Sequence, residues 1–595
     1  VLLYCHEGRL NRVEQRMWLV NSDDTDNRPL RPEETPELRI GHEFWFADGL
    51  HVGYQAQDAT KRIGVADYRD GSYQEYVTPF SDGHVQASPD GKLFVADGSD
   101  REPFLNLYRL EDGKLTGGHI HRHDSSRAKQ HWHPHPAFSP DGKWVLFTSS
   151  HGENGNVYLI RTAADPVVVS PESEALFPEA EKLHREVGAL GKAAWRPMLS
   201  YAVDLHVRST HAPEPPFAMP WEEIGPGYGY GPAFGHWDIV HAIIDVLPTA
   251  PEHAERQLLN NRRLQLENGY LPGVIWMPGE RNPRDGKHSF DPSGQSHPPV
   301  WVVAADDYLQ LTGDSTHLRE FYEGAARQIV WFEQARAAEP AGFYYNDIRT
   351  HRWESGVDEG VRFDGPAMGP LACIDATSQV YQLCDYAAKW ARMLGEDATP
   401  WSDRADRLRE FINTRLWEEK GGFYYDVWAI DDPTQRTQAF EGLWPLIVGA
   451  AKPEQAKRII DEWLLDPQRF LTKHPIPTVG ASDPKFELRM WRGPAWNSMT
   501  FWVARGCMRY GRPEVAAQLL EAALDDTAAQ FDRTGTIWEF FHSHGGLPEE
   551  VLRKPHTWRN QPWRDYMGHN PVLAMARLWQ EAGRPADPVR TAGQP

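Results

Sequence analysis

The sequence has few cysteines, no long apolar run and no excess of positive charge. Its four cysteines (Cys5, Cys373, Cys384 and Cys507) are too scattered for a disulfide framework, which favours a reducing compartment. No stretch is apolar enough to predict a transmembrane helix. The net charge of −22 argues against a nucleic-acid partner. These absences predict a cytoplasmic protein that binds neither nucleic acid nor membrane.

The sequence also lacks a methionine at its first position. It opens with Val1, and VLLYCHEG matches the strand within KWVLFTSSHGEN near residue 147. We therefore expect the sequence to begin in the middle of a repeat, and the presence of a signal peptide upstream stays open.

Aromatic residues, by contrast, are abundant. The chain has 24 tryptophans, and 12% of its residues are aromatic. This abundance fits carbohydrate binding, although large helical enzymes also use tryptophan to fill their cores. With 595 residues, the chain is long enough for two or more domains.

Three histidines recur at one position of a repeated turn signature. His42, His84 and His135 each stand seven residues before the glycine of HEFWFADG, HVQASPDG and HPAFSPDG. The turn glycines lie 42 and 51 residues apart, a spacing typical of propeller blades. Because one register faces the same place in every blade, we expect the three rings to converge on a central channel.

Residues 1–168 are therefore predicted to form part of a β-propeller. The segments QRMWLVN, RIGVADYR, NLYRLED and NVYLIRT recur as third strands, which indicates about four blades. In residues 169–595 the hydrophobic period becomes helical, and PEQAKRIIDEWLLD places five apolar residues on one face: Ala456, Ile459, Ile460, Trp463 and Leu464. About a dozen such patterns predict an all-α toroid of helical hairpins.

One short segment of the propeller region concentrates metal ligands. QHWHPH offers the amide oxygen of Gln130 and the imidazoles of His133 and His135, which point to the same face of a strand. Mixed nitrogen and oxygen ligands suit Mn²⁺ or Fe²⁺ better than thiolate-bound Zn²⁺. The alternative is a solvated histidine-rich loop, and the repeated register favours the metal site.

The propeller region resembles the C-terminal half of oligogalacturonate lyase, a seven-bladed family. CHEG, QRMWLVN, IGHEFWFADG, HVQASPDGKLFVADG and QHWHPHPAFSPDGKWVLFT occur in order, up to about residue 162. The resemblance implies that His42 removes the proton α to a uronate carboxylate and that Arg16 binds this carboxylate. It also implies Mn²⁺, which would stabilise the enediolate before β-elimination, held by His84, Gln130, His133 and His135. The first half of the family's propeller has no counterpart in this sequence.

Two carboxylate motifs stand out in the helical region. HRWESGVDEGVRFDGP places Glu354 and Asp358 beside Trp353, and GTIWEFFHSHGG places Glu539 between two aromatic residues. Apolar surroundings disfavour the charged carboxylate and raise its pKa toward that of a general acid. A pair of carboxylates across a pocket is what glycoside hydrolysis requires, whereas a single one is more often solvated or salt-bridged.

The helical region resembles inverting (α/α)6 glycosidases of the trehalase, processing α-glucosidase and mannosylglycerate hydrolase group. The matching segments run in order over roughly residues 215–580: FGHWDIVHAI, NGYLPGVIW, SHPPVWVVAADDYLQLTGD, RWESGVDEG, MWRGPAWNSMTFW, TIWEF and MGHNPVLAMA. The resemblance implies a hydrolase without a cofactor, with Asp358 as general acid and Glu539 as general base. It also implies a sugar site lined by Trp237, Asp238, Trp276, Trp353, Trp491, Arg492, Gly493 and Trp496.

Two segments depart from the pattern of this group. SHPP stands where the group usually has Gln before the prolines, and EFFHSHGG stands where Glu is usually followed by Asn or Tyr. The first change bears on recognition of the sugar hydroxyls or of an aglycone carboxylate. The second makes Glu354 a further candidate for the site and the rival of Glu539 as base.

Three functional hypotheses remain open. The leading one is an inverting hydrolase of oligosaccharides or glycosides, fused to a propeller segment. A second makes the pectin-degrading lyase the principal identity, with the helical region processing its products. A third is a non-catalytic protein that only binds polysaccharide, which loss of Asp358 or Glu539 would have favoured. Uronate lyases share the helical toroid but need a Tyr or His base near an Arg.

Overall fold

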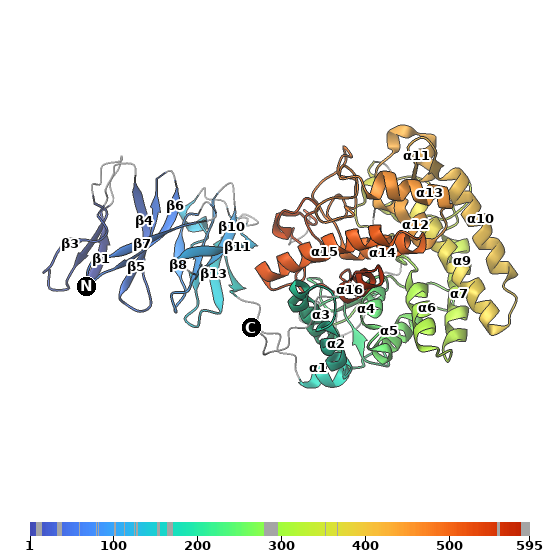
Figure 1. Cartoon of the computed structure of the whole chain (residues 1–595), viewed down its shortest axis with the longest axis horizontal. Coiled ribbons are helices and arrows are strands. Elements are labelled where there is room, and N and C mark those ends of the chain that lie inside the picture. Colours follow the sequence, from blue (N-terminus) through green and yellow to red (C-terminus); the bar gives the residue numbers. More distant parts are fainter. Residues whose placement is uncertain are drawn as a thin grey trace. The chain divides into compact units, whose positions relative to one another are not determined.

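The computed structural model divides the chain into two compact units (Figure 1). The first consists of Val1–Pro166 and Arg533–Gly535, and the second consists of Val167–Asp532 and Thr536–Pro595. The structure describes all residues except 7–14, 33–37, 59, 79, 81, 100–102, 112, 124, 126–128, 151–154, 163–170, 279–294, 352, 366, 556–559 and 585–595. The boundary expected between 168 and 169 lies outside the described residues.

The first unit contains four antiparallel sheets in which each strand pairs with its neighbour in sequence. The first sheet has β1 (Leu2–Cys5), β2 (Met17–Val20) and β3 (Arg28–Pro29), and the second has β4 (Arg39–Trp45), β5 (His51–Gln57), β6 (Lys61–Asp67) and β7 (Tyr73–Val77). The third has β8 (Val85–Ala87), β9 (Leu93–Ala96), β10 (Phe104–Glu111) and β11 (Lys114–Arg122), and the fourth has β12 (Ala137–Phe138), β13 (Trp144–Ser149) and β14 (Asn156–Arg161). A short helix, η1 (Gln130–Trp132), precedes the fourth sheet. This architecture confirms the all-β, propeller-like prediction.

The turn signature seen in the sequence is a real structural repeat. Gly49, Gly91 and Gly142 have φ of 65°, 70° and 72°, a region that favours glycine because it lacks a Cβ. Each glycine N–H donates to a carbonyl three residues earlier, at 3.1, 2.8 and 2.8 Å. The repeated turn places the three preceding histidines at equivalent positions of successive sheets.

Six helices of the second unit form a closed inner ring, in which each contacts the next and the last contacts the first. They are α4 (Asp238–Val246), α6 (Trp301–Thr312), α9 (Ile374–Leu394), α12 (Trp444–Val448), α14 (Asn497–Arg509) and α16 (Val572–Glu581). The helices that follow the first five along the chain are α5 (Pro251–Arg263), α7 (Leu318–Ala335), α10 (Thr399–Arg415), α13 (Pro453–Arg458) and α15 (Pro513–Thr534), while α3 (Arg196–Ser209) packs on α16. The (α/α)6 toroid is thus confirmed.

Short elements complete this unit. The short helices are α1 (Pro171–Leu176), α2 (Ala180–Val187), η2 (Ala193–Trp195), α8 (Asp347–Thr350), η3 (Val361–Phe363), α11 (Val427–Asp431), η4 (Pro433–Gln435), η5 (Phe440–Leu443), η6 (Ile459–Leu464) and η7 (Pro548–Glu550). The short strands in the described part of this unit form three antiparallel pairs: β15 (Thr210–His211) with β16 (Trp221–Glu222), β17 (Ala233–Gly235) with β18 (Val274–Trp276), and β19 (Trp417–Glu418) with β20 (Phe423–Tyr424).

Burial distinguishes the inner from the outer helices. Every residue of α4 is buried, whereas α10 buries only Ala405, Ile412 and Asn413. A helix packed on all sides is apolar around its circumference, and an outer helix needs only one apolar stripe. The face predicted in PEQAKRIIDEWLLD is buried along α13 and the π-helix η6. In the described part of the chain, no helix is both long enough and apolar enough to cross a membrane.

Long connections lead into the N-terminal ends of most inner helices. The widest precede α6, α9, α14 and α16, and they carry almost all of the tryptophan and carboxylate motifs noted in the sequence. Because the inner helices form one ring, these connections meet above the same opening. The fold therefore brings motifs that are far apart in sequence to one end of the toroid.

Candidate functional site

A cavity of about 420 Å³ lies where these connections meet. Trp237 and Asp238 stand at the start of α4, Trp496 stands before α14, and His569 stands shortly before α16. The described residues that line it are Ile224, Tyr228, Gly229, Tyr230, Trp237, Asp238, Val274, Trp276, His297, Trp353, Gly356, Asp358, Met490, Trp491, Trp496, Glu539, Arg553, Lys554, Tyr566 and His569. Its size and mixed lining are those of a pocket for a small ligand.

Five expected tryptophans line this cavity. Trp491 stacks on Trp496 with ring centroids 3.7 Å apart and planes 5° apart. Trp276 meets Trp353 edge to face at 5.8 Å, and Trp237 completes the set. Such walls provide flat apolar surfaces next to polar groups, which is the lining that sugar rings require.

Both expected catalytic carboxylates also line the cavity. Asp358 lies in the connection before η3, with its side chain 21% exposed, and its Oδ2 accepts from Lys554 Nζ at 2.5 Å. Glu539 is 1% exposed and accepts from Arg553 Nε at 2.8 Å and from the N–H of Trp563 at 3.0 Å.

A third carboxylate, that of Asp238, also lines the cavity. Asp238 is 4% exposed, and its Oδ1 accepts from the hydroxyl of Tyr566 at 3.0 Å. Burial, together with the charges of Asp358 and Glu539, raises the pKa of Asp238 to about 7. Asp238 can therefore carry a proton at neutral pH and donate a hydrogen bond to a ligand.

His569 is held neutral beneath the tryptophans. Trp237 Nε1 donates to His569 Nε2 at 3.0 Å, and His569 Nδ1 lies 2.8 Å from the hydroxyl of Ser498. Burial lowers the pKa of His569 well below its usual range. The nitrogen that accepts from Trp237 carries no hydrogen, so Nδ1 bears the proton and the ring fixes the orientation of Trp237.

Three residues expected at the sugar site do not line the cavity. Glu354 is fully buried, and its carboxylate accepts from Arg336 Nε at 2.8 Å and from the hydroxyl of Ser296 at 3.1 Å. Arg492 donates to Asp364 at 2.8 and 2.7 Å and to Glu487 at 2.9 Å. A Cβ on Gly493 would meet the carbonyl oxygen of Glu487 at 2.5 Å. These three residues pack or pair within the surrounding loops. Sequence motifs alone do not distinguish such residues from residues that contact a ligand.

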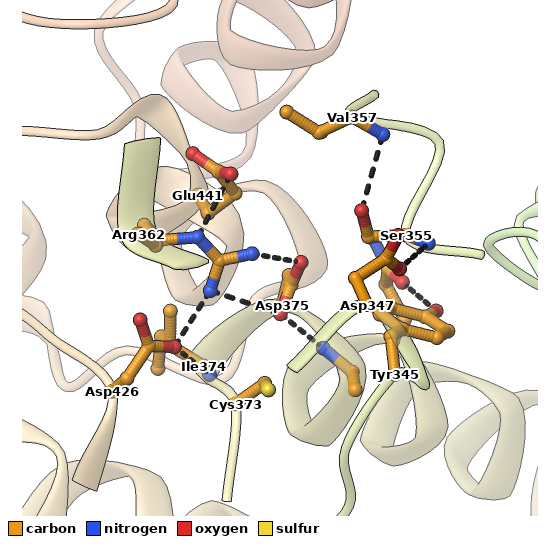
Figure 2. A network of polar contacts seen from close by, with 12 residues as sticks. Tyr345, Asp347, Ser355, Val357, Arg362, Cys373, Ile374, Asp375, Asp426 and Glu441 are labelled. Carbon is orange, nitrogen blue, oxygen red and sulfur yellow. Dashed lines mark hydrogen bonds and ion pairs between the residues drawn. The ribbon is translucent and has the colours of Figure 1, made fainter. Parts of the chain in front are cut away.

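The loop that carries Asp358 is anchored on both sides (Figure 2). Upstream, the N–H of Ser355 donates to Asp347 Oδ2 at 2.7 Å. Downstream, Arg362 donates to three buried carboxylates from separate elements: Asp375 at 2.6 Å, Asp426 at 2.6 Å and Glu441 at 2.9 Å. Burial raises the pKa of Glu441 to about 7 although Arg362 opposes the change. The guanidinium thus fastens the loop to α9, to the start of α11 and to η5.

Several residues of the cavity were missed by sequence reasoning, and four of them contact the predicted residues through polar groups. Arg553 and Lys554 are adjacent in LRKPHTW, and Tyr566 and His569 belong to DYMGHN. MGHNPVLAMA, which contains His569, was noted for its resemblance to glycosidases, but this side chain was not assigned, and Tyr566 precedes the segment. A basic dipeptide is usually a solvated surface feature, so no sequence signal identified the first two.

The expected metal ligands of the first unit do converge. The ligand atoms of His84, His133 and His135 all lie within 4.8 Å of one another. His84 Nδ1 lies 2.7 Å from Asp97 Oδ2, so Nε2 is the ring nitrogen left for a cation. Three imidazoles with a buried carboxylate behind one of them fit a divalent transition metal. The side chain of Gln130 lies outside the described residues.

Of the other two residues implied by the lyase resemblance, His42 lies next to this cluster and Arg16 pairs with Glu43. The ring of His42 stacks on that of His84 with centroids 4.4 Å apart, and its Nδ1 lies 2.9 Å from the carbonyl oxygen of Gly83. Burial lowers the pKa of His42, which favours the neutral form that a base requires. Arg16 Nε donates to Glu43 at 2.5 Å. An anionic ligand of Arg16 would therefore compete with a carboxylate of the protein.

Two family models match different parts of the chain. The model described as "Mannosylglycerate hydrolase MGH1-like glycoside hydrolase domain" matches residues 232–558, and the model for oligogalacturonate lyase matches residues 1–166. Both resemblances drawn from the sequence motifs are thus confirmed.

Individual relatives match one region each. Mannosylglycerate hydrolase MGH1 from Selaginella moellendorffii is 33% identical over 53% of this chain and 76% of its own length. Oligogalacturonide lyase from Pectobacterium atrosepticum is 33% identical over 27% of this chain, which spans only 46% of that relative. The crystal structure of GH63 mannosylglycerate hydrolase from Thermus thermophilus in complex with Tris covers 64% of this chain and 98% of its own, with 19% identity and a TM-score of 0.49.

Proposed function

Because the chain belongs to the MGH1-like glycoside hydrolases over residues 232–558, we propose that its helical unit hydrolyses a glycosidic bond with inversion at the anomeric carbon. The observation that carries this proposal is the convergence of Asp358 and Glu539 on one tryptophan-lined cavity. A carboxylic acid and a carboxylate on opposite sides of a sugar are the two groups that an inverting mechanism needs.

The roles that we propose for the two carboxylates are those implied by the resemblance to inverting glycosidases. Glu539, ion-paired with Arg553, is the general base and takes a proton from the attacking water. Asp358, the more exposed of the two, is the general acid and gives a proton to the glycosidic oxygen as the bond to the anomeric carbon breaks. The tryptophans hold the sugar, and protonated Asp238 binds one of its hydroxyls. No cofactor enters this reaction.

We propose a small glycoside with an acidic aglycone as substrate class. The matched relatives are named for mannosylglycerate, in which the sugar is linked to glyceric acid. A small anionic substrate fits the cavity, since its volume is about 420 Å³ and Lys554 lines it.

The stereochemistry of the product tests the mechanism. Proton NMR during hydrolysis of glycosylglycerates should show a first-formed sugar of opposite anomeric configuration to the substrate. A first-formed sugar of unchanged configuration would indicate a covalent intermediate and refute inversion.

We also propose that the first unit binds a divalent cation, with Mn²⁺ as the first candidate. His84, His133 and His135 would hold the ion, with Gln130 as the fourth expected ligand, and the bound ion would supply charge stabilisation for an enolate. His42, beside this cluster, would serve as base, and Arg16 would bind a uronate carboxylate if it exchanges Glu43 for the ligand.

A further inference from the structure

Lys554 reaches into the cavity and pairs with the proposed general acid. Its Nζ lies 2.5 Å from Asp358 Oδ2, and the two side chains are only 15% and 21% exposed. Burial lowers the pKa of Lys554, but the charge and the hydrogen bond of Asp358, together with Tyr230, raise that pKa above its usual range. The ammonium group is therefore charged, and it is closely compensated by Asp358.

This pairing conflicts with the role of an acid. The carboxyl oxygen that accepts the hydrogen bond of Lys554 cannot at the same time donate a proton to the glycosidic oxygen. The neighbouring pair of Glu539 and Arg553 shows no such conflict, because a general base must be ionised. Asp358 therefore has to exchange its partner before it can act.

We propose that Lys554 is an anion subsite shared between Asp358 and the substrate. The carboxylate of an acidic aglycone binds Lys554 in place of Asp358, which then takes up a proton and becomes the competent acid. This inference rests on the proposed hydrolase function. It adds that Lys554 selects the substrate and that substrate binding precedes the protonation of Asp358.

The charges and protons balance through the cycle. On binding, the substrate brings one negative charge to Lys554, and Asp358 takes one proton from solvent, so the net charge of the cavity is unchanged. During hydrolysis Asp358 gives this proton to the glycosidic oxygen, while Glu539 takes a proton from the water whose oxygen bonds to the anomeric carbon. Departure of the anionic aglycone returns Lys554 to Asp358, and Glu539 releases its proton to solvent.

A neutral aglycone cannot make this exchange. A glycoside of glycerol has the size and hydroxyl groups of the glycerate compound but no carboxylate, so it leaves Asp358 paired with Lys554. The proposal therefore predicts selection by reactivity as well as by binding, visible in kcat and not only in KM.

The first experiment compares glycosylglycerate with the same sugar linked to glycerol. For the wild-type protein, kcat/KM for the glycerate compound should be at least about tenfold higher than for the glycerol compound, because only the glycerate carboxylate can replace Asp358 beside the positive charge of Lys554. Lys554→Met should abolish the preference by slowing the glycerate compound and leaving the glycerol compound equal or faster. Lys554→Arg should retain it, and Lys389→Met, which removes a lysine paired with Asp306 outside the cavity, should change neither rate.

A second experiment detects the proton directly and does not require turnover. Calorimetric titration with free glycerate in buffers of different ionisation enthalpy should show proton uptake on binding, which Asp358→Asn should abolish. Binding without proton uptake, or a substrate preference that survives Lys554→Met, would overturn the shared subsite. Wild-type protein that cleaves neither glycoside would instead contradict the proposed function itself.

Discussion

Asp358 and Glu539 line the same cavity but pair with different cations, Lys554 and Arg553, and this difference distinguishes their proposed roles. A lysine beside one carboxylate can exchange for a substrate anion, whereas the two-nitrogen contact of Arg553 with Glu539 is a fixed, buried ion pair. Glu354, the rival base in the sequence motif, is as buried as Glu539 but is absent from the cavity lining.

Substitution of the two carboxylates should give distinct kinetic signatures. Asp358→Asn should slow hydrolysis of an alkyl glycoside by about 10²–10⁴-fold, while an activated aryl glycoside retains more of its rate because its leaving group needs less protonation. Glu539→Gln should slow both substrates to a similar extent, since both need an activated water. Steady-state rates on the two substrates give the comparison. The matched control is Glu487→Gln, which lies outside the cavity, and equal losses for both substrates with Asp358→Asn would contradict its role as acid.

Asp238 should make stability depend on pH. Its pKa is raised from 3.8 to about 7 by burial, so the folded protein holds a proton there that the unfolded chain releases at lower pH. This contribution to stability is complete below about pH 4 and is lost as pH rises through about 7. Thermal unfolding of Asp238→Asn should accordingly show a weaker decline of Tm between pH 4 and pH 8 than the wild type. Parallel pH curves for the two proteins would contradict this assignment.

At the level of elements, Arg362 attaches the loop between α8 and α9 to neighbouring elements by ion pairs. Three carboxylates from α9, the residue before α11 and η5 converge on its guanidinium, and each of these four side chains is at most 5% exposed. Cys373, Asp375 and Asp426 have ligand atoms within 4.8 Å of one another, but Arg362 already supplies the positive charge at this place. The network is therefore best explained as an anchor for the loop that carries Asp358.

Loss of this anchor should be costly. Arg362→Met leaves three buried carboxylates without their counter-ion, so we expect a loss of about 3–5 kcal/mol in the free energy of unfolding. Arg404→Met removes an arginine paired with Glu333 at the surface and should cost less than about 1 kcal/mol. Denaturant titrations of both variants measure the difference. Similar small losses would show that the buried network contributes no more than a surface pair.

At the level of the whole molecule, each of the two units has its own candidate site. The helical unit needs no metal for the proposed reaction, whereas the histidine cluster of the sheets has the donor set of a metal site. The chain spans less than half of the lyase that it matches, and for this reason metal binding is the property to measure in the first unit.

Metal binding should separate from hydrolysis in the full chain. Calorimetric titration with Mn²⁺ should show binding that His84→Ala or His135→Ala abolishes and that Asp97→Asn weakens by about 10–100-fold, since Asp97 orients His84. His51→Ala, which removes a histidine paired with Asp48 away from the cluster, should leave the affinity unchanged. Glycoside hydrolysis should be the same with and without the metal. Unaltered Mn²⁺ affinity in His84→Ala would contradict the site.

The fold followed from the sequence because its signals are local and periodic. Turn glycines at blade-like spacing predicted the sheets, because each blade repeats the same turn. Apolar residues at helical spacing predicted the toroid, because they mark the side of each helix that faces the core. The five tryptophans and the two carboxylates could be chosen in advance because their motifs combine residue types that packing alone does not require.

What the sequence could not determine was which charged groups share a pocket. Glu354, Arg492 and Gly493 belong to the same motifs as the cavity residues but pair or pack beside it, while Arg553 and Lys554 come from an ordinary basic segment and line it. The physical reason is that a motif determines local chain geometry, whereas ion pairing also depends on distances between segments far apart in sequence. Asp358 and Lys554, for example, are 196 residues apart. Only closure of the helical ring brings these charges within reach of one another.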